Sequence, residues 1–310
     1  MIDGVQPQGA RIRQGGITGK SLADMAATVR DYFALTKPRI IILLLLTTVT
    51  TMFVAEPSGP PLSVILWTIL GGFLAAGGAG AVNHYLDRDR DARMERTSSR
   101  PIVSGRIPAT HGLIFGLVLG MAAFLQLWMT VNPLAAILAM VGFLGYILLY
   151  TVWLKPLTPQ NIVIGGSAGA VPPLVGWAAA TGSLSLEALW PFAIIFFWTP
   201  PHFWALSLMI KDDYEKTGVP MLPVVKGELV TRRQILVYTV ILFAVSLGPV
   251  FTGLLGPIYL VAAVGLGLVF TGLAAALLRR PSMALTLRTY LFSLAYLALL
   301  FVAMAVDAVA

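Results

Sequence analysis

The chain contains no cysteine, and charged residues make up only 11% of its 310 positions. Without cysteine it has no disulfides, thiolate metal ligands or thiol nucleophiles. Acidic residues are scarce, with 14 Asp and Glu against 21 Lys and Arg. Hydrophobic residues reach 57% and gather in long, nearly uncharged stretches. This composition excludes a soluble globular protein and predicts an integral membrane protein.

Nine of these stretches are candidates for membrane-spanning helices, and together they predict an all-α fold. They cover residues 40–55, 62–86, 111–131, 134–154, 160–180, 188–209, 235–255, 257–279 and 284–306. The first stretch is short for a span, so we expect its helix to begin near Lys37 or earlier.

The positions of the basic residues predict the orientation of the chain. Six precede the first stretch, six follow the second, one follows the fourth, five follow the sixth, and three lie around the eighth and ninth, which accounts for all 21. By the positive-inside rule the N-terminus is cytoplasmic and the C-terminus external. The net charge of +7 therefore reflects topology and attraction to anionic lipids, and it does not indicate nucleic-acid binding.

The first 36 residues contain acids and have no apolar core segment, so they read neither as a signal peptide nor as a transit peptide. We expect residues 1–36 to form a cytoplasmic tail that ends in an interfacial helix from Leu22 to Leu35. Residues 37–310 are expected to form one intramembrane domain. The short tail favours a multi-pass protein of the bacterial inner (cytoplasmic) membrane.

Three oxygen-bearing side chains, Asn83, Asp87 and Asp91, follow one another at intervals of four at the end of the second stretch. On a helix each such step advances about 40° around the axis and about 6 Å along it, so the three form one polar stripe. Carboxylate and amide oxygens suit Mg²⁺, which is commonly held by one or two carboxylates and the phosphates of a substrate. The alternative is a polar patch at a helix end, although acids at such a place are costly enough to need a reason.

A second acidic pair, Asp212 and Asp213, follows the sixth stretch. Even-numbered spans end at the same face, so both acidic clusters are expected at the cytoplasmic side. Each leads into a loop of about 22 residues, at 89–110 and 211–234. Long loops in compact proteins are mostly functional. We therefore expect the two loops to form a cytoplasmic cap over a membrane-embedded cavity, which makes the active site face the cytoplasm.

The first of these loops is rich in arginine. On a continuing helix Arg93 and Arg96 are neighbours, and guanidinium groups match phosphate oxygens bidentately. Carboxylates for a metal beside arginines for phosphate are what a Mg²⁺-diphosphate requires. The other interpretation is that these arginines only anchor the topology of the chain.

The sixth stretch has a strongly aromatic segment around Trp198 and His202, interrupted by Pro200 and Pro201. Stacked aromatic rings can shield an allylic cation or flank a planar macrocycle. The alternative is that Trp198 and His202 serve only in packing. The paired prolines predict a broken helix, which membrane proteins tolerate where it lines a cavity.

Glycines recur in the second stretch, at Gly71–Gly72, Gly77–Gly78 and Gly80. Small residues let membrane helices approach closely, so we interpret these positions as packing sites. The same interpretation covers Gly165–Gly166 and Gly169 in the fifth stretch.

The chain resembles the UbiA-type intramembrane prenyltransferases and, within them, the branch of protoheme IX farnesyltransferases (haem O synthases). The similar segments are Leu35–Arg39, Asn83–Asp91, Met94–Pro101, Thr158–Gly166, Pro201–Ser207 and Asp212–Pro223. The first acidic motif is shared by the whole superfamily. The last two segments are specific to the haem branch, and the expected acceptor depends on them.

The resemblance implies nine transmembrane helices around a central cavity, with Mg²⁺ and farnesyl diphosphate at the cytoplasmic cap. Asn83, Asp87 and Asp91 would hold one Mg²⁺, and Asp212 or Asp213 the other. The implied diphosphate contacts are Arg93, Arg96, Arg100 and Lys211, and the implied haem-site residues are His202 and Trp198. A vinyl group of haem b would attack the farnesyl cation, and water would complete the product, haem O. Downstream partners would be a haem A synthase or an oxidase in assembly.

Two features depart from the family pattern. The superfamily usually spaces its second pair of acids by four, whereas Asp212 and Asp213 are adjacent, as in the haem branch. After the fourth stretch the branch usually has Lys-Arg, whereas here Lys155 is followed by Pro156, so an anion contact in that loop depends on Lys155 alone.

Two other functions remain as alternatives. A prenyltransferase acting on a quinone or chlorophyll precursor would share the acidic motif but not the segment around His202. A cation-coupled transporter is less compatible, because transporters place their acids near the middle of the membrane on broken helices within repeats. Here the acids cluster at one interface beside arginines.

Overall fold

The computed structural model describes residues 22–310, and every regular element in that range is helical. The predicted tail therefore lies outside the described residues as far as residue 21. The interfacial helix expected from Leu22 to Leu35 is present with those bounds as α1. Its place in the membrane interface stays a prediction, as do the orientation of the termini and the single domain at 37–310.

Within residues 22–310, nine helical segments are long and apolar enough to cross a membrane, which confirms the predicted number. The first three are α2 (Pro38–Ala55), α3 (Leu62–Leu86) and α5 (Ala109–Thr130). The fourth joins α6 (Pro133–Leu144), the π-helix η1 (Gly145–Leu154) and α7 (Lys155–Leu157), and the fifth joins α8 (Asn161–Gly169) and α9 (Val171–Thr181). The last four are η2 (Leu186–Ala188) with α10 (Leu189–Met209), then α13 (Gly227–Phe251), α14 (Pro257–Arg279) and α15 (Met283–Val309). The first span begins at Pro38, next to Lys37 as expected.

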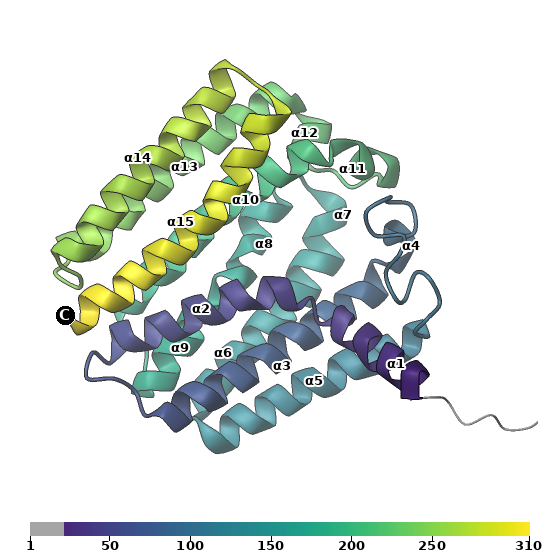
Figure 1. Ribbon diagram of the computed structural model, residues 1–310, viewed down its shortest axis with the longest axis horizontal. Coiled ribbons are helices and arrows are strands. Elements are labelled where there is room, and N and C mark those ends of the chain that lie inside the picture. The colour runs from purple at the N-terminus through teal and green to yellow at the C-terminus, as the bar shows by residue number, and fades with distance from the viewer. Residues whose placement is uncertain (1–21) are drawn as a thin grey trace, which may run out of the picture.

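Three short helices lie outside the spans. They are α4 (Arg88–Asp91), α11 (Lys211–Thr217) and α12 (Leu222–Val225). Figure 1 shows α4 and α11 at the same end of the molecule, the end where α3 and α10 finish. Both predicted acidic clusters therefore lie at one face of the helical array.

The helices form two groups that differ in their packing. The N-terminal half consists of the first five spans, in which α3 packs along α5, and α9 packs along α2 and α6. The C-terminal half consists of α10, α13, α14 and α15, which pack against one another. Figure 1 shows α15 crossing beside α2, and this contact joins the halves together with a contact between α8 and α10.

The break in the helices is not where the sequence analysis placed it. Helix α10 continues through Pro200 and Pro201, so the expected break in the sixth span is wrong. The fifth span is interrupted instead, at Ala170, where φ is −90° and ψ is −4°. Pro172 and Pro173 then fall in the first turn of α9, where a helix has no use for the missing N–H groups.

Glycines bring α3 and α5 into backbone contact. A Cβ atom at Gly78 would lie 2.6 Å from the carbonyl oxygen of Gly116, and one at Gly116 would lie 2.7 Å from that of Gly78. No other residue fits at either position, which confirms the packing interpretation for Gly78. Gly169 is different, because a Cβ there would meet nothing within 4 Å, so its interpretation as a packing site is wrong.

Candidate active site

The predicted polar stripe is present at the end of α3 and is buried. Asn83, Asp87 and Asp91 are exposed by 3%, 2% and 4% of their surface. Helix α3 ends at Leu86, but the spacing survives because the N–H of Asp87 donates to the carbonyl of Asn83 (2.9 Å), and the N–H of Asp91 to that of Asp87 (2.8 Å). The Asn83 side chain also donates to Asp87 Oδ2 at 2.8 Å. Two carboxylates and an amide thus share one face.

Two basic side chains hold Asp87. Lys155 Nζ donates to Oδ2, and Arg90 Nη1 lies 3.1 Å from Oδ1. Burial by itself would raise the pKa of Asp87, but the charges and hydrogen bonds of Lys155 and Arg90 outweigh it and hold this pKa below its usual value. Asp87 is therefore a carboxylate at neutral pH although it is buried.

Two further basic residues complete the surroundings of the stripe. Arg100 Nη1 forms an ion pair with Asp91 Oδ2, and Lys37 Nζ donates to Asn83 Oδ1 at 2.5 Å. Burial, reinforced by nearby positive charge, lowers the pKa of Lys37 to about 7. Within residues 22–310, Lys37 is also the one non-glycine residue in the left-handed region, with φ at 58°. The backbone is strained at the point that delivers this ammonium group.

The charges around the stripe do not balance. Two carboxylates meet four basic side chains, and these are Lys37, Arg90, Arg100 and Lys155. Lys37 is only partly charged at neutral pH, but Arg90, Arg100 and Lys155 still outnumber the two carboxylates, so an anion such as a diphosphate is stabilised here. The donor set also fits Mg²⁺, because all the candidate ligands are hard oxygens. Among the described residues no three His, Cys, Asp or Glu side chains are grouped to hold a metal, so a bound metal here would share phosphate oxygens.

The second acidic pair lies on α11, with Asp212 exposed and Asp213 half-buried. The next residue on α11, Tyr214, is buried. Burial raises the pKa of Tyr214 to about 12, Arg96 opposes that rise, and Asp87 and Asp213 reinforce it. Tyr214 is therefore within electrostatic reach of both acidic clusters.

A small apolar cluster joins the two loops. Met94 from the first loop packs with Tyr214, Val219 and Met221 from the second. This contact supports the expected cap. The first loop is not helical as far as Arg96, however, because α4 ends at Asp91, so the neighbourhood expected for Arg93 and Arg96 on a continuing helix is wrong.

Several predicted diphosphate contacts lie outside the basic cluster, which consists of the four side chains around the stripe: Lys37, Arg90, Arg100 and Lys155. Arg93 is exposed and donates to the carbonyl of Asp89 at 3.3 Å. Lys211 forms an ion pair with Glu228 at 3.7 Å. Arg96 is exposed but acts on Tyr214, so it lies closer to the site. Of the predicted phosphate-binding set, the structure brings Arg100 into direct contact with the stripe.

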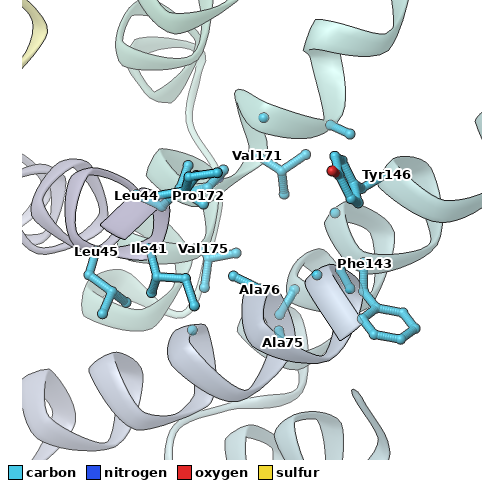
Figure 2. A pocket seen from close by; sticks show the side chains of 18 of the residues that line it. Ile41, Leu44, Leu45, Ala75, Ala76, Phe143, Tyr146, Val171, Pro172 and Val175 are labelled. Atoms are coloured by element: carbon cyan, nitrogen blue, oxygen red, sulfur yellow. The ribbon is translucent and has the colours of Figure 1, made fainter. Parts of the chain in front are cut away.

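An apolar cavity of about 230 Å³ begins beside the stripe. Lys37 and Tyr146 line the end nearest the stripe, and the remaining wall is almost entirely apolar. Figure 2 shows this wall: Ile41, Leu44 and Leu45 from α2, Ala75 and Ala76 from α3, Phe143 from α6, and Val171, Pro172 and Val175 from α9. Gly169 also lines the cavity, which explains the free space around it.

His202 and Trp198 belong to α10, and their rings contact α15. The His202 ring is stacked between Trp198 (centroids 4.2 Å apart) and Tyr290 (4.9 Å apart). His202 Nδ1 is 2.7 Å from Ser293 Oγ, and Trp198 Nε1 donates to the carbonyl of Ser293 at 2.7 Å. These bonds fix both rings, and they are compatible with a packing role as well as with a binding role.

Sequence reasoning missed Lys37, Arg90 and Tyr146 as site residues. Lys37 and Arg90 were counted as topological charges, and only the fold brings Lys37 to Asn83, 46 residues away. The signal that was available for Lys37 is its place in the segment Leu35–Arg39. Thr151 was missed too, and Asn83 donates to its hydroxyl at 3.2 Å. It lies in the unpredicted π-helix, an element frequently found at functional sites.

Comparison with known proteins adds a family to this geometry. Residues 44–305 match the UbiA prenyltransferase family. A protein named protoheme IX farnesyltransferase from Roseiflexus sp. (strain RS-1) is 52% identical over 97% of this chain and 56% of its own length. A protein of the same name from Symbiobacterium thermophilum is 50% identical over 90% of this chain and 94% of its own. The chain thus spans about half the length of some curated relatives it matches and nearly all of others.

Solved structures share the fold at lower identity. A digeranylgeranylglyceryl phosphate synthase is 18% identical, with a TM-score of 0.75 over 91% of this chain and 99% of that one. A UbiA homologue from Archaeoglobus fulgidus, bound to GPP and Mg²⁺, is 14% identical, with a TM-score of 0.66 over 88% of this chain and 99% of that one. At these identities the likeness shows the fold alone.

Proposed function

This chain belongs to the UbiA prenyltransferase family, and on that premise we propose that it is a Mg²⁺-dependent intramembrane farnesyltransferase. Its substrates are farnesyl diphosphate and haem b, and its product is haem O. The observation that carries the proposal is the site itself. Four basic side chains surround two buried carboxylates at the mouth of an apolar cavity, which is a receptor for an anionic head with an apolar tail.

The anionic head binds at the stripe. Asn83, Asp87 and Asp91 would hold one Mg²⁺ and Asp213 would contribute to a second, and bound Mg²⁺ would supply positive charge that stabilises the leaving diphosphate. Arg90 and Lys155 contact the carboxylate of Asp87, and Arg100 contacts that of Asp91, so their donor groups lie beside the site proposed for the diphosphate. Lys155, Arg90 and Arg100 therefore stabilise the remaining charge on the departing phosphate oxygens.

The apolar tail occupies the cavity. A farnesyl chain there lies against alanine, glycine and branched aliphatic side chains, away from water. Exclusion of water protects the allylic cation that forms when the C–O bond breaks. Tyr146, at the same end of the cavity as Lys37, presents an aromatic ring near the reacting carbon and can stabilise that cation.

The acceptor is haem b, the substrate that the names of the curated relatives indicate. A vinyl carbon attacks C1 of the farnesyl cation, and the carbocation left on the former vinyl group takes up water and releases a proton, which gives the hydroxyethylfarnesyl chain. The Trp198–His202–Tyr290 stack offers planar surfaces beside which a porphyrin can lie. We therefore assign His202 and Trp198 to the acceptor site.

The site faces the cytoplasm, and the membrane is the bacterial inner membrane. The basic residues that flank the acidic clusters support this orientation through the positive-inside rule. Both acidic clusters lie at the end of the molecule that carries α4 and α11 (Figure 1). Farnesyl diphosphate, a charged soluble molecule, reaches a site on that side directly.

One reaction tests the proposal. Purified protein in detergent is incubated with haem b, farnesyl diphosphate and Mg²⁺, with and without a chelator, and the haem is analysed by mass spectrometry. We expect a chelator-sensitive mass gain of one farnesyl group and one water. Transfer to an added aromatic acceptor instead of haem would overturn the acceptor and keep the diphosphate site, and no transfer to either would overturn the proposal.

A further inference from the structure

The apolar cavity has a defined far end. Its wall begins at Lys37, the residue before α2, and then follows one face of α2 through Ile41 and Leu45 to Thr48. There α9 crosses so closely that a Cβ atom at Gly176 would overlap the carbonyl oxygen of Thr48. Backbone contact at this point leaves no passage between the two helices.

Below Thr48 the walls converge on a solid cluster. One turn further along each wall lie small residues, namely Ala135 and Ala136 on α6 and Ala178 and Ala179 on α9. One turn beyond Thr48 on α2 lies Met52, which is fully buried in the same cluster. Met52 is therefore the α2 side chain that packs in this cluster, together with these alanines and with Val175 and Leu127.

The depth of the cavity matches one chain length. Eleven residues separate Lys37 from Thr48, which is roughly 16 Å along a helix. An isoprene unit has four backbone bonds of about 1.5 Å, so three units extend to roughly 15 Å and four to roughly 20 Å. The α2 wall of the cavity therefore ends at about the length of a farnesyl chain, and Met52 lies one turn beyond that end.

We propose that Met52 sets the length of the prenyl chain that this protein accepts, by closing the cavity below Thr48. The proposal rests on the proposed function, since it presumes a prenyl diphosphate with its head at the stripe. It adds a residue that selects among prenyl diphosphates and takes no part in the chemistry. Figure 2 shows Ala75 and Val175 in the cavity wall, and both belong to the buried cluster that contains Met52.

The test measures binding and not turnover. Dissociation constants of geranyl, farnesyl and geranylgeranyl diphosphate are determined with Mg²⁺ for the wild type and for Met52→Ala. Since one methylene in an apolar pocket changes selectivity by about tenfold or more, Met52→Ala should shift the preference from farnesyl toward geranylgeranyl by at least about tenfold. Val175→Phe, which fills the same end from α9, should shift it toward geranyl.

A matched control separates length selection from a general loosening of the core. Leu127 is also fully buried in this cluster, but it lies on α5 and packs against Gly71, outside the cavity wall. Leu127→Ala should leave the order of the three ligands unchanged. If Met52→Ala does not fold, Val175→Phe still tests the proposal from the other direction.

The outcomes distinguish this proposal from the proposed function. A wild type that binds none of the three ligands overturns the prenyltransferase function itself. A wild type that prefers farnesyl diphosphate, with the same preference in Met52→Ala and Val175→Phe, keeps the function and overturns the role of Met52. An equal shift in Leu127→Ala also overturns that role.

Discussion

The two halves of this membrane domain are built from similar apolar helices. The N-terminal half contains a cavity (the hollow half), whereas large side chains fill the interior of the C-terminal half (the filled half). The N-terminal half holds the cavity, whose walls include Gly72, Ala75, Ala76, Ala79 and Gly80. The C-terminal half packs large side chains in its interior, and its fully buried aromatic residues are Trp204, Tyr259, Phe270, Tyr296 and Phe301. Residue size, more than hydrophobicity, separates a binding region from a supporting one.

The polar groups follow the same division. In the N-terminal half, partly buried basic side chains surround the two buried carboxylates of the stripe and outnumber them. In the C-terminal half, buried polar groups include paired hydroxyls, as in the contact of 2.7 Å between Ser246 and Tyr296. Surplus buried charge is expensive unless a ligand compensates it, whereas paired hydroxyls stabilise the fold by themselves. The four predictions below test this division.

The largest effect is expected for Asp87→Asn. This change removes a proposed metal ligand and leaves Lys155 and Arg90 without their carboxylate, so turnover should fall by about 1,000-fold or more. Membrane insertion should persist, because no span changes. Turnover of purified protein and its yield in the membrane fraction check this. The control is Asp89→Asn, an exposed partner of Arg88, which should keep its activity. Full activity of Asp87→Asn would exclude the metal role.

Lys155→Met should have the next largest effect. Without this ammonium group the pKa of Asp87 rises toward its usual value, and the diphosphate loses a charged donor, so kcat/KM for farnesyl diphosphate should fall about a hundredfold. Lys211→Met is the matched control, since Lys211 pairs with Glu228 instead and such an exposed pair contributes little. Equal losses in the two variants would contradict the assignment of Lys155, and not Lys211, to the diphosphate site.

A smaller effect is expected for His202→Ala, where the C-terminal half is proposed to touch a substrate. Loss of the stacked ring should raise the KM for haem about tenfold and leave the KM for farnesyl diphosphate unchanged. His111→Ala, at an exposed histidine of α5, should change neither constant. Kinetics with each substrate varied separately check this, and equal losses for both substrates would refute the assignment.

The sequence was sufficient for the spans, because each span is a local property. Long apolar stretches fix their number and approximate ends, and the spacing of Asn83, Asp87 and Asp91 fixes their common face. The charged partners of the stripe are not local. Lys155 reaches Asp87 from 68 residues away, and Lys37 reaches Asn83 from 46. Such pairs depend on how helices pack, which no window of sequence contains.

Proline shows the same limit within single spans. The sequence has two adjacent proline pairs inside spans, Pro172–Pro173 and Pro200–Pro201, and the pattern alone does not distinguish them. The first pair begins a new helix after the break at Ala170, whereas the second lies within the continuous α10, which α13 and α15 flank. Neighbouring helices decide which interruption is tolerated.

The smallest expected effect comes from hydroxyl deletions, one in each half. Tyr296→Phe removes the contact with Ser246 in the filled half, so the free energy of unfolding should fall by about 1 kcal/mol while turnover stays unchanged. Tyr146→Phe changes the hollow half: it keeps the ring assigned to the cation and removes a hydroxyl within electrostatic reach of Asp87, so turnover should fall by only a few-fold and thermal stability should not change. Thermal unfolding in detergent and steady-state kinetics measure both. If Tyr296→Phe lowered turnover as much as Tyr146→Phe, the filled half would take part in the chemistry, and the division between a binding half and a supporting half would be wrong.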